Sequence, residues 1–244
     1  MKYFVSADVH GFYDEWITAL NEKQFDINNP DHKIIVCGDL FDRGRQPKEV
    51  QSFVLDLIEK DKIILVKGNH EDLALELIEN YANYIFRIRD TRHYHNRTFQ
   101  TFLDLTGLSH YEAVTCLLEF KRRASNTEYV KNIIPKMINY FETENYVFVH
   151  SWVPVNLNDI EFDWRNATEE EWQKARWYKP LDMYKNGLTV PNKTLVFGHR
   201  RCSDFWKSLE NKRDCHAPYI TKDIIALDTT TVISKKVNVV VIED

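Results

Sequence analysis

Side chains of the types that bind metal ions follow five apolar, strand-like runs of this 244-residue chain. In α/β proteins, active sites lie beyond the carboxyl ends of the strands, so residues in these positions are suited to chemistry. Carboxylates, imidazoles and an amide oxygen can together hold two divalent cations, which activate water for attack on a phosphate ester. The candidate metal ligands are Asp8, His10, Asp39, Asn69, His150 and His199. They predict a two-metal site that acts on phosphate esters.

The first two motifs, DVHG and GDLFDRG, hold their polar residues at short intervals. If the chain is extended after the first strand, a period of two puts Asp8 and His10 on the same side, where they can hold one cation. The two oxygens of Asp39 can bridge two ions, and the guanidinium of Arg43 matches two phosphate oxygens. Alone, the first motif fits an ordinary strand-end turn slightly better, so the prediction depends on all five motifs together.

The third motif, GNHE, offers two different functions. The side-chain oxygen of Asn69 is a hard, neutral metal ligand, and the adjacent His70 points elsewhere and is free for proton transfer. Asn69 could also cap a helix that starts here, with His70 incidental. Both interpretations can hold together, because a capping turn also orients the side chains.

The elements that must position these residues follow from apolar periodicity. Residues 14–23 and 47–60 have helical spacing and alternate with the first strands, which predicts an α/β domain. Residues from about 73 to 141 break this pattern with helical stretches at 73–84, 111–123 and 127–140. We therefore expect a single domain, 1–244, with a helical insertion before the fourth core strand. The expected strands are 3–6, 33–37, 62–66, 146–149, 194–197, 224–227 and 237–242.

Composition excludes several classes of function. The formal net charge of −5 argues against nonspecific binding to nucleic acid. No apolar run approaches the roughly 20 residues that a membrane helix needs, so no membrane partner is expected. The four cysteines are scattered and lack metal-binding spacing, which favours a reduced, cytoplasmic protein. The sequence does not indicate an oligomeric state.

Taken together, the motifs resemble the calcineurin-like metallophosphoesterase superfamily. The Arg43-Gly44 pair resembles its phosphoprotein phosphatase branch, which contains Ser/Thr phosphatases and symmetrical diadenosine tetraphosphatases. The wider phosphodiesterase branch usually ends in Gly-His-x-His, whereas Arg201 stands here in place of the second histidine. The resemblance covers residues 1–72 and 145–244. It implies a four-layer sandwich of two mixed β-sheets flanked by helices, with the helical insertion outside the match.

The resemblance also implies a role for each motif residue. Asp39 and a hydroxide would bridge two metal ions, with Asp8 and His10 on the first ion. Asn69, His150 and His199 would complete the second. Arg43 would bind phosphate, and His70, oriented by Asp42, would be the general acid for the leaving oxygen.

The branch usually supplies another arginine to the phosphate from the segment before the last histidine. Residues 175–179 read Ala-Arg-Trp-Tyr-Lys, so either Arg176 or Lys179 could serve. Arg200, directly after His199, is a third candidate, and the sequence leaves the choice open.

The expected function is metal-dependent hydrolysis of phosphate monoesters by direct attack of a metal-bridging hydroxide, as in Ser/Thr protein phosphatases. The ligand types favour manganese, iron or zinc over calcium, with manganese expected. The alternative is a symmetrical dinucleoside polyphosphate hydrolase, for which basic residues of the insertion, such as Arg87, Arg92 and Arg97, could attract a polyanion. A solvated face of the helical segment is the interpretation that the sequence slightly favours for those residues. A non-catalytic binding protein is the third possibility, disfavoured because every expected ligand is present.

Overall fold

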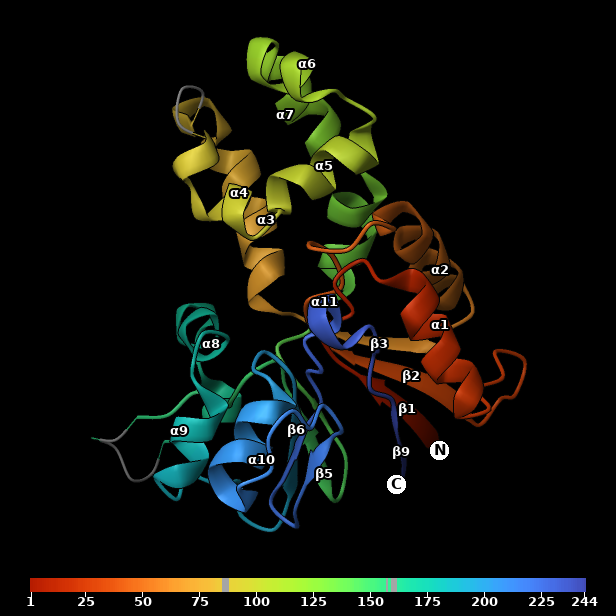
Figure 1. The fold of residues 1–244 in the computed structure, drawn as a ribbon, viewed down its shortest axis with the longest axis vertical. Coiled ribbons are helices and arrows are strands. Elements are labelled where there is room, and N and C mark those ends of the chain that lie inside the picture. Colours follow the sequence, from red (N-terminus) through yellow and green to blue (C-terminus); the bar gives the residue numbers. More distant parts are fainter. Residues whose placement is uncertain (85–87, 157, 159–161) are drawn as a thin grey trace.

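Two mixed β-sheets form the centre of the molecule, a computed structural model that describes residues 1–84, 88–156, 158 and 162–244 (Figure 1). The first sheet has the order β3-β2-β1-β9. Strand β1 (Lys2–Ser6) pairs in parallel with β2 (His32–Cys37), which pairs in parallel with β3 (Ile63–Val66). Strand β9 (Val240–Glu243) runs antiparallel to β1 and forms the other edge. The parallel strands therefore end at one edge of the sheet.

The second sheet has the order β4-β5-β6-β8-β7. Its three central strands, β5 (Tyr146–Phe148), β6 (Thr194–Phe197) and β8 (Ile224–Ala226), are parallel. The short edge strands β4 (Phe141–Glu142) and β7 (Tyr219–Ile220) are antiparallel to their neighbours.

Alternation of apolar side chains along the strands explains how the sheets stack. Val5 and Val196 belong to one buried cluster, which draws from both sheets and fills the space between them. Their neighbours Phe4 and Leu195 point to the opposite faces and join two further clusters under the helices. The result is the expected four-layer α/β sandwich. Its helical layers contain α1 (Tyr13–Glu22) and α2 (Pro47–Glu59) on one side and α8 (Glu169–Ala175), α9 (Pro180–Lys185) and α10 (Cys202–Glu210) on the other.

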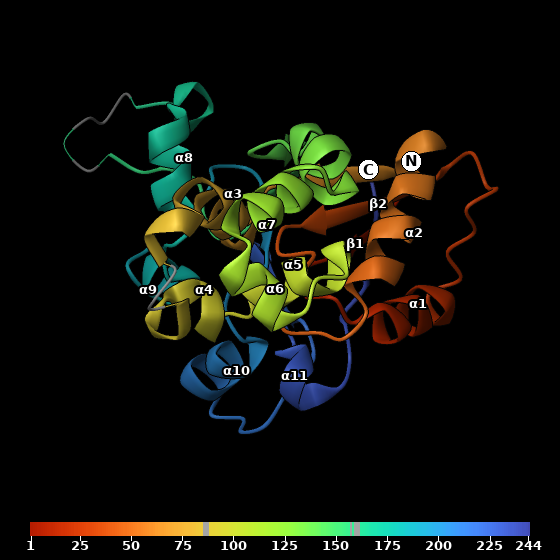
Figure 2. The same ribbon diagram turned by 90° about the horizontal axis from the view of Figure 1, so that it is seen from above.

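Helices between β3 and β4 form the upper part of the molecule in Figure 1 and lie over one end of the sandwich in Figure 2. Phe99, Phe102 and Phe120 anchor them, because these rings belong to the same buried cluster as Phe4 of β1. This helical segment comprises α3 (Asn69–Asn80), α4 (Arg92–His95), α5 (Thr98–Thr106), α6 (His110–Thr115) and α7 (Leu117–Ser125).

The structure differs from the sequence-based expectation in several elements. The helix expected at 111–123 is divided at Cys116, which has φ −118° and ψ 64°. The stretch 127–140 forms only a π turn, Tyr129–Ile133, and a 3₁₀ turn, Ile134–Lys136, because Pro135 cannot donate a helical hydrogen bond. The last expected strand forms only at Val240–Glu243.

Arg87, one of the basic residues of the insertion, lies outside the described residues. Within the described part of the chain, no helix is long and apolar enough to cross a membrane.

Candidate metal centre

The loops that carry the predicted ligands leave corresponding ends of the parallel strands in both sheets. Asp8 follows β1 and Asp39 follows β2, while His150 and His199 follow β5 and β6. Asn69 begins α3 directly after β3. Asp8, Asp39, Asn69 and His150 are each at most 2% exposed. The structure thus brings ligands from both sheets into one buried cluster.

The first ligand loop is a turn, and the expected extended segment is wrong. Asp8 and His10 have φ of 52° and 51°, and Asp39 has φ of 55°. These values lie in the left-handed region, which is uncommon for residues with a side chain. Hydrogen bonds between the two loops support it: the Asp8 N–H donates to Gly38 O at 3.2 Å and the His10 N–H to Asp39 O at 2.9 Å. The side chains converge because the loops pair with each other.

In one half of the cluster, His150, His199 and Asn69 meet. His150 Nδ1–H donates to the Cys37 carbonyl at 2.9 Å, so its Nε2 carries a lone pair. That atom lies 2.7 Å from Asn69 Oδ1 and 3.1 Å from His199 Nδ1. Burial lowers the pKa of His150, and burial and His150 lower the pKa of His199 to about 2, so both imidazoles are neutral at pH 7. The lone pairs of the two imidazoles and of the Asn69 oxygen thus face one another at 2.7 to 3.1 Å, an arrangement that could hold a cation between them.

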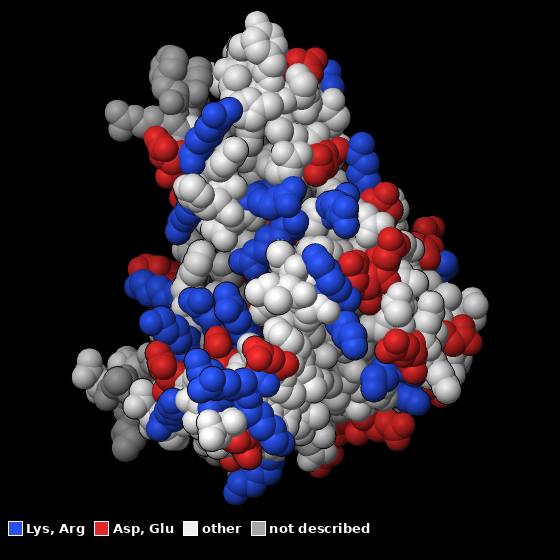
Figure 3. All heavy atoms as spheres, viewed as in Figure 1, with Lys and Arg blue, Asp and Glu red and all other residues white. Residues whose placement is uncertain are grey.

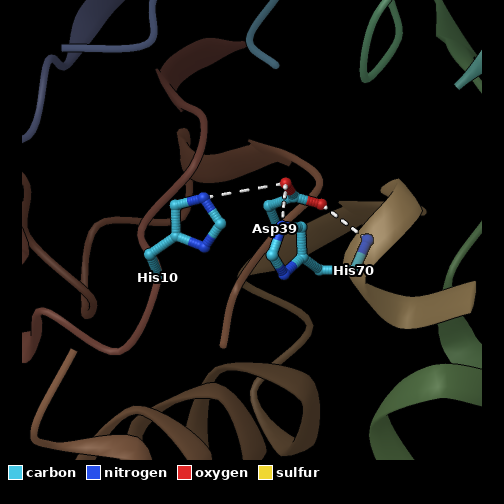
Figure 4. A group of neighbouring side chains, drawn as sticks. All are labelled: His10, Asp39 and His70. Carbon is cyan, nitrogen blue, oxygen red and sulfur yellow. Dashed lines mark hydrogen bonds and ion pairs between the residues drawn. The ribbon is translucent and has the colours of Figure 1, made fainter. Parts of the chain in front are cut away.

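In the other half, His10 lies beside Asp39 (Figure 4), and Asp8 lies close to His10. His10 Nδ1–H donates to the Phe41 carbonyl at 2.8 Å, which leaves Nε2 to face Asp8 Oδ1 at 3.8 Å and Asp39 Oδ2 at 3.7 Å. Burial, together with the nearby carboxylates Asp228 and Asp39, raises the pKa of Asp8 well above its usual range. Several buried carboxylates at close range require positive charge to balance them, which divalent cations would supply.

Asp39 lies between the two halves. Its Oδ2 is 3.7 Å from His10 Nε2, while its Oδ1 is 3.5 Å from His150 Nε2. Candidate ligand atoms of Asp39, His150 and His199 all lie within 4.8 Å of one another, as do those of His10, Asp39 and His70. The central carboxylate therefore has one oxygen near each group of candidate ligands, which is the position that a carboxylate bridging two cations would need. The mixed nitrogen and oxygen donors suit a transition metal.

His70, Asp42 and Arg43 line the same cluster. His70 Nδ1–H donates to Asp42 Oδ2 at 2.5 Å. Although burial opposes it, the Asp39 and Asp42 carboxylates raise the pKa of His70 above its ordinary value. Arg43 places Nη1 at 2.8 Å from His10 Nε2 and Nη2 at 3.1 Å from His70 Nε2, so its guanidinium lies within the site.

The sequence reasoning missed three buried residues that hold this site. The Glu71 carboxylate accepts hydrogen bonds from the backbone N–H groups of Gly68 at 2.7 Å and of Asp39 and Leu40 at 3.1 Å. A Glu three residues after a helix N-cap can accept from the N-cap N–H, as Glu71 does from Gly68, and this half of a capping box is a signal that could have identified it. Thr98 and Thr101 donate to Asp42 from α5, and no local pattern indicates that contact.

The three candidates for a second phosphate contact lie in different surroundings. Arg176 is 2% exposed and donates to Asp72 at 2.7 Å, to Glu169 at 2.6 Å and to Asn139 at 2.7 Å. These partners connect α3, α8 and the segment before β4, and they engage the whole guanidinium. The structure does not pair Arg176 with any residue of the metal-ligand cluster.

Lys179 and Arg200 instead line an open pocket of about 520 Å³ beside α10. Basic side chains gather over α9 and α10 in Figure 3. Trp177, 39% exposed, has its ring centre 6.1 Å from that of His199 and 5.8 Å from the Arg92 guanidinium. The other pocket residues are Leu181, Asp182, Asp204, Lys207 and Ser208. A basic pocket and an exposed indole thus lie next to a candidate metal ligand.

Comparison with known proteins agrees with this geometry. The chain is 34% identical over 76 residues to an asymmetrical bis(5'-nucleosyl)-tetraphosphatase of Bacillus velezensis. This match covers 29% of this chain and 30% of the relative. It is 36% identical over 69 residues to a symmetrical bis(5'-nucleosyl)-tetraphosphatase of a Buchnera aphidicola strain, covering 28% of this chain and 23% of the relative. The matches therefore span about a third of these curated relatives or less.

Solved structures share the fold across nearly the whole chain. A cold-active protein tyrosine phosphatase matches with a TM-score of 0.58 and 17% sequence identity. The match covers 99% of this chain and 73% of the phosphatase chain. The model of the family described as calcineurin-like phosphoesterase matches residues 1–210, which include every candidate metal ligand. The resemblance seen in the motifs is thereby confirmed, and the chain belongs to the calcineurin-like phosphoesterase family, hydrolases of phosphoric esters that use divalent metal ions.

Proposed function

We propose that this protein hydrolyses phosphate monoesters directly at a two-metal centre, in the manner of Ser/Thr protein phosphatases. The observation that carries the proposal is the position of Asp39 between two groups of candidate ligands, which together draw on both sheets. When bound, two divalent cations would supply an activated water and stabilise negative charge on the phosphate. Asp8, His10, Asn69, His150 and His199 would hold them with Asp39, and manganese is the metal we expect.

The chain's own residues would then bind the phosphate and complete the proton transfer. Arg43 would exchange its contacts with His10 and His70 for two phosphate oxygens, because its fork matches them. His70 would donate a proton from Nε2 to the leaving oxygen, while Asp42 holds Nδ1–H and fixes the ring. No covalent intermediate with the protein is needed.

The test is turnover of p-nitrophenyl phosphate and of phosphopeptides by the purified protein with added manganese, alongside elemental analysis. We expect phosphate release that requires metal, and an Asp39→Asn protein that loses both metal and activity. Asp56→Asn, at a half-exposed position of α2 where Asp56 pairs with Lys60, is the matched control that should retain both. No release from any of these monoesters by metal-loaded protein would refute the proposal.

A second candidate, hydrolysis of dinucleoside polyphosphates, is favoured by the pocket beside His199. Lys179, Arg200 and Lys207 could bind a polyphosphate, and the exposed Trp177 ring offers a surface on which a base could stack. The names of the curated relatives support the same substrate class.

Chromatography of diadenosine tetraphosphate products decides this second candidate. Symmetrical cleavage gives only ADP, whereas asymmetrical cleavage gives ATP and AMP. If the indole binds a base, Trp177→Leu should raise KM for the dinucleotide on the order of tenfold and leave KM for p-nitrophenyl phosphate unchanged. Absence of any cleavage of the dinucleotide would remove this candidate without touching the first.

A further inference from the structure

We propose that Thr98 and Thr101, on the first turn of α5, are positioning residues that fix the Asp42–His70 pair for proton transfer. Thr98 Oγ1 donates to Asp42 Oδ2 at 2.7 Å, and Thr101 Oγ1 donates to Asp42 Oδ1 at 2.7 Å. Each carboxylate oxygen therefore has its own hydroxyl donor, in addition to His70 Nδ1. The proposal rests on the proposed function, because it assumes that His70 donates the proton to the leaving oxygen.

Burial makes these two hydrogen bonds decisive for the orientation of Asp42. Thr98 is 0% exposed, Asp42 3% and Thr101 4%, so water cannot easily replace a lost hydroxyl. A carboxylate that loses a donor in such surroundings rotates toward another one or leaves a lone pair unsatisfied. Either change would alter the direction of Asp42 Oδ2, the atom that holds the His70 ring.

The helix that carries the two threonines is itself held firmly against the core. Residues three apart lie on the same face of a helix, so Thr98 and Thr101 both face Asp42. Phe102, on the next turn, contacts Tyr129 with ring centres 6.1 Å apart, and Tyr129 contacts Phe41 at 4.1 Å. Because Phe41 is the residue before Asp42, packing and hydrogen bonding fix the same loop. The helical segment would thus serve the chemistry directly, through Asp42.

A leaving-group comparison separates positioning from a merely structural effect. A general acid matters for a poor leaving group, such as phenol in phenyl phosphate, and little for a good one, such as 2,4-dinitrophenol. In the step concerned, the bond from phosphorus to the leaving oxygen breaks and that oxygen takes the Nε2 proton of His70. Loss of positioning should therefore slow the first substrate selectively.

The variants are Thr98→Val, Thr101→Val and their combination, since valine keeps the shape and removes the hydroxyl. We expect the double variant to lose on the order of tenfold or more in kcat on phenyl phosphate. Its kcat on 2,4-dinitrophenyl phosphate should stay within about twofold, with unchanged metal content. Thr98→Ser and Thr101→Ser should retain activity on both substrates. Thr106→Val is the matched control, because the described hydrogen bonds of its hydroxyl are all local, to carbonyls of its own helix and from the Leu108 N–H.

Each outcome bears on the proposal. Equal losses on the two substrates, or no loss on either, would overturn it. If the valine variants do not fold, Thr101→Cys is measured in the same way, because a thiol is a weak donor and should produce a smaller selective loss. His70→Asn identifies the failing assumption: if it shows no selectivity between leaving groups, the proposed proton transfer is wrong, whatever the threonines do.

Discussion

At the scale of single residues, function depends on which atom of each side chain is left available. Backbone carbonyls occupy Nδ1 of both His10 and His150, so each ring presents Nε2 to the cluster. The sequence could predict the ligand types, because each follows an apolar strand. It could not predict which nitrogen faces the metal, since that depends on carbonyls of Phe41 and Cys37, far away along the chain.

Arg43 provides the first prediction at this scale. Its two terminal nitrogens reach His10 and His70 together, a geometry that a lysine cannot reproduce. We expect Arg43→Lys to raise KM for p-nitrophenyl phosphate on the order of tenfold, because one point charge replaces a two-pronged contact. Steady-state kinetics measures this, and Arg45→Lys, on an exposed neighbour, should leave KM unchanged. An unchanged KM in Arg43→Lys would contradict a phosphate contact.

Glu71 provides a second prediction, for stability. Its carboxylate accepts three backbone N–H groups that belong to the loops carrying Asp39 and Asn69. Glu71→Gln turns an amide donor toward N–H groups and should lower the free energy of unfolding by about 1–3 kcal/mol. Urea denaturation measures the loss, and Glu79→Gln, exposed on the same helix, should cost little. Equal stability of the two variants would show that Glu71 is dispensable.

At the scale of elements, local patterns predicted most strands but not the contacts between distant segments. The strands are short apolar runs, and their period of two is visible in the sequence. The bond from Thr98 to Asp42 was not predictable, because it joins two residues that are 56 positions apart in the chain. The interruption at Cys116 has no signal in the apolar periodicity of that stretch. The edge strands β4 and β7 are two residues each, too short to show a period.

The ion pairs by which Arg176 connects α3 and α8 provide a test of whether Arg176 contacts phosphate. Its buried guanidinium binds Asp72 of α3 and Glu169 of α8, so Arg176→Met would leave Asp72 with Lys67 as its remaining cation. We expect unfolding to become easier by about 3 kcal/mol, the usual cost of breaking a buried pair. KM for p-nitrophenyl phosphate should stay unchanged. Lys174→Met, exposed on α8, is the control. A raised KM with little loss of stability would instead restore Arg176 as a phosphate contact.

At the scale of the whole molecule, the candidate centre joins the two sheets. Asp8 and Asp39 come from the first sheet, and His150 and His199 from the second. Between the sheets lies a buried apolar cluster, and the ligand loops bring polar groups of both sheets together beyond the strand ends. The His199 N–H already donates to Asp8 Oδ2 at 2.8 Å across this joint. A cation bound by both halves would therefore add to their association.

Metal removal is the last prediction, and it follows from this joint. Cations that bind only the folded state stabilise it by about 2.7 kcal/mol when their free concentration is a hundred times Kd. For a chain of this length, that corresponds to a Tm roughly 5–10 °C higher than that of chelator-treated protein. Thermal unfolding with and without manganese measures the shift, which should nearly vanish in Asp39→Asn and persist in Asp56→Asn. The metal-dependent gain in stability comes from the ligands that face each other in the folded protein. Burial has already made His150 and His199 neutral, so both can bind a cation without first losing a proton. If removal of the ions from a protein shown to be metal-loaded left its Tm unchanged, the ions would not prefer the folded state to the unfolded chain, and a buried centre held by these ligands would be wrong.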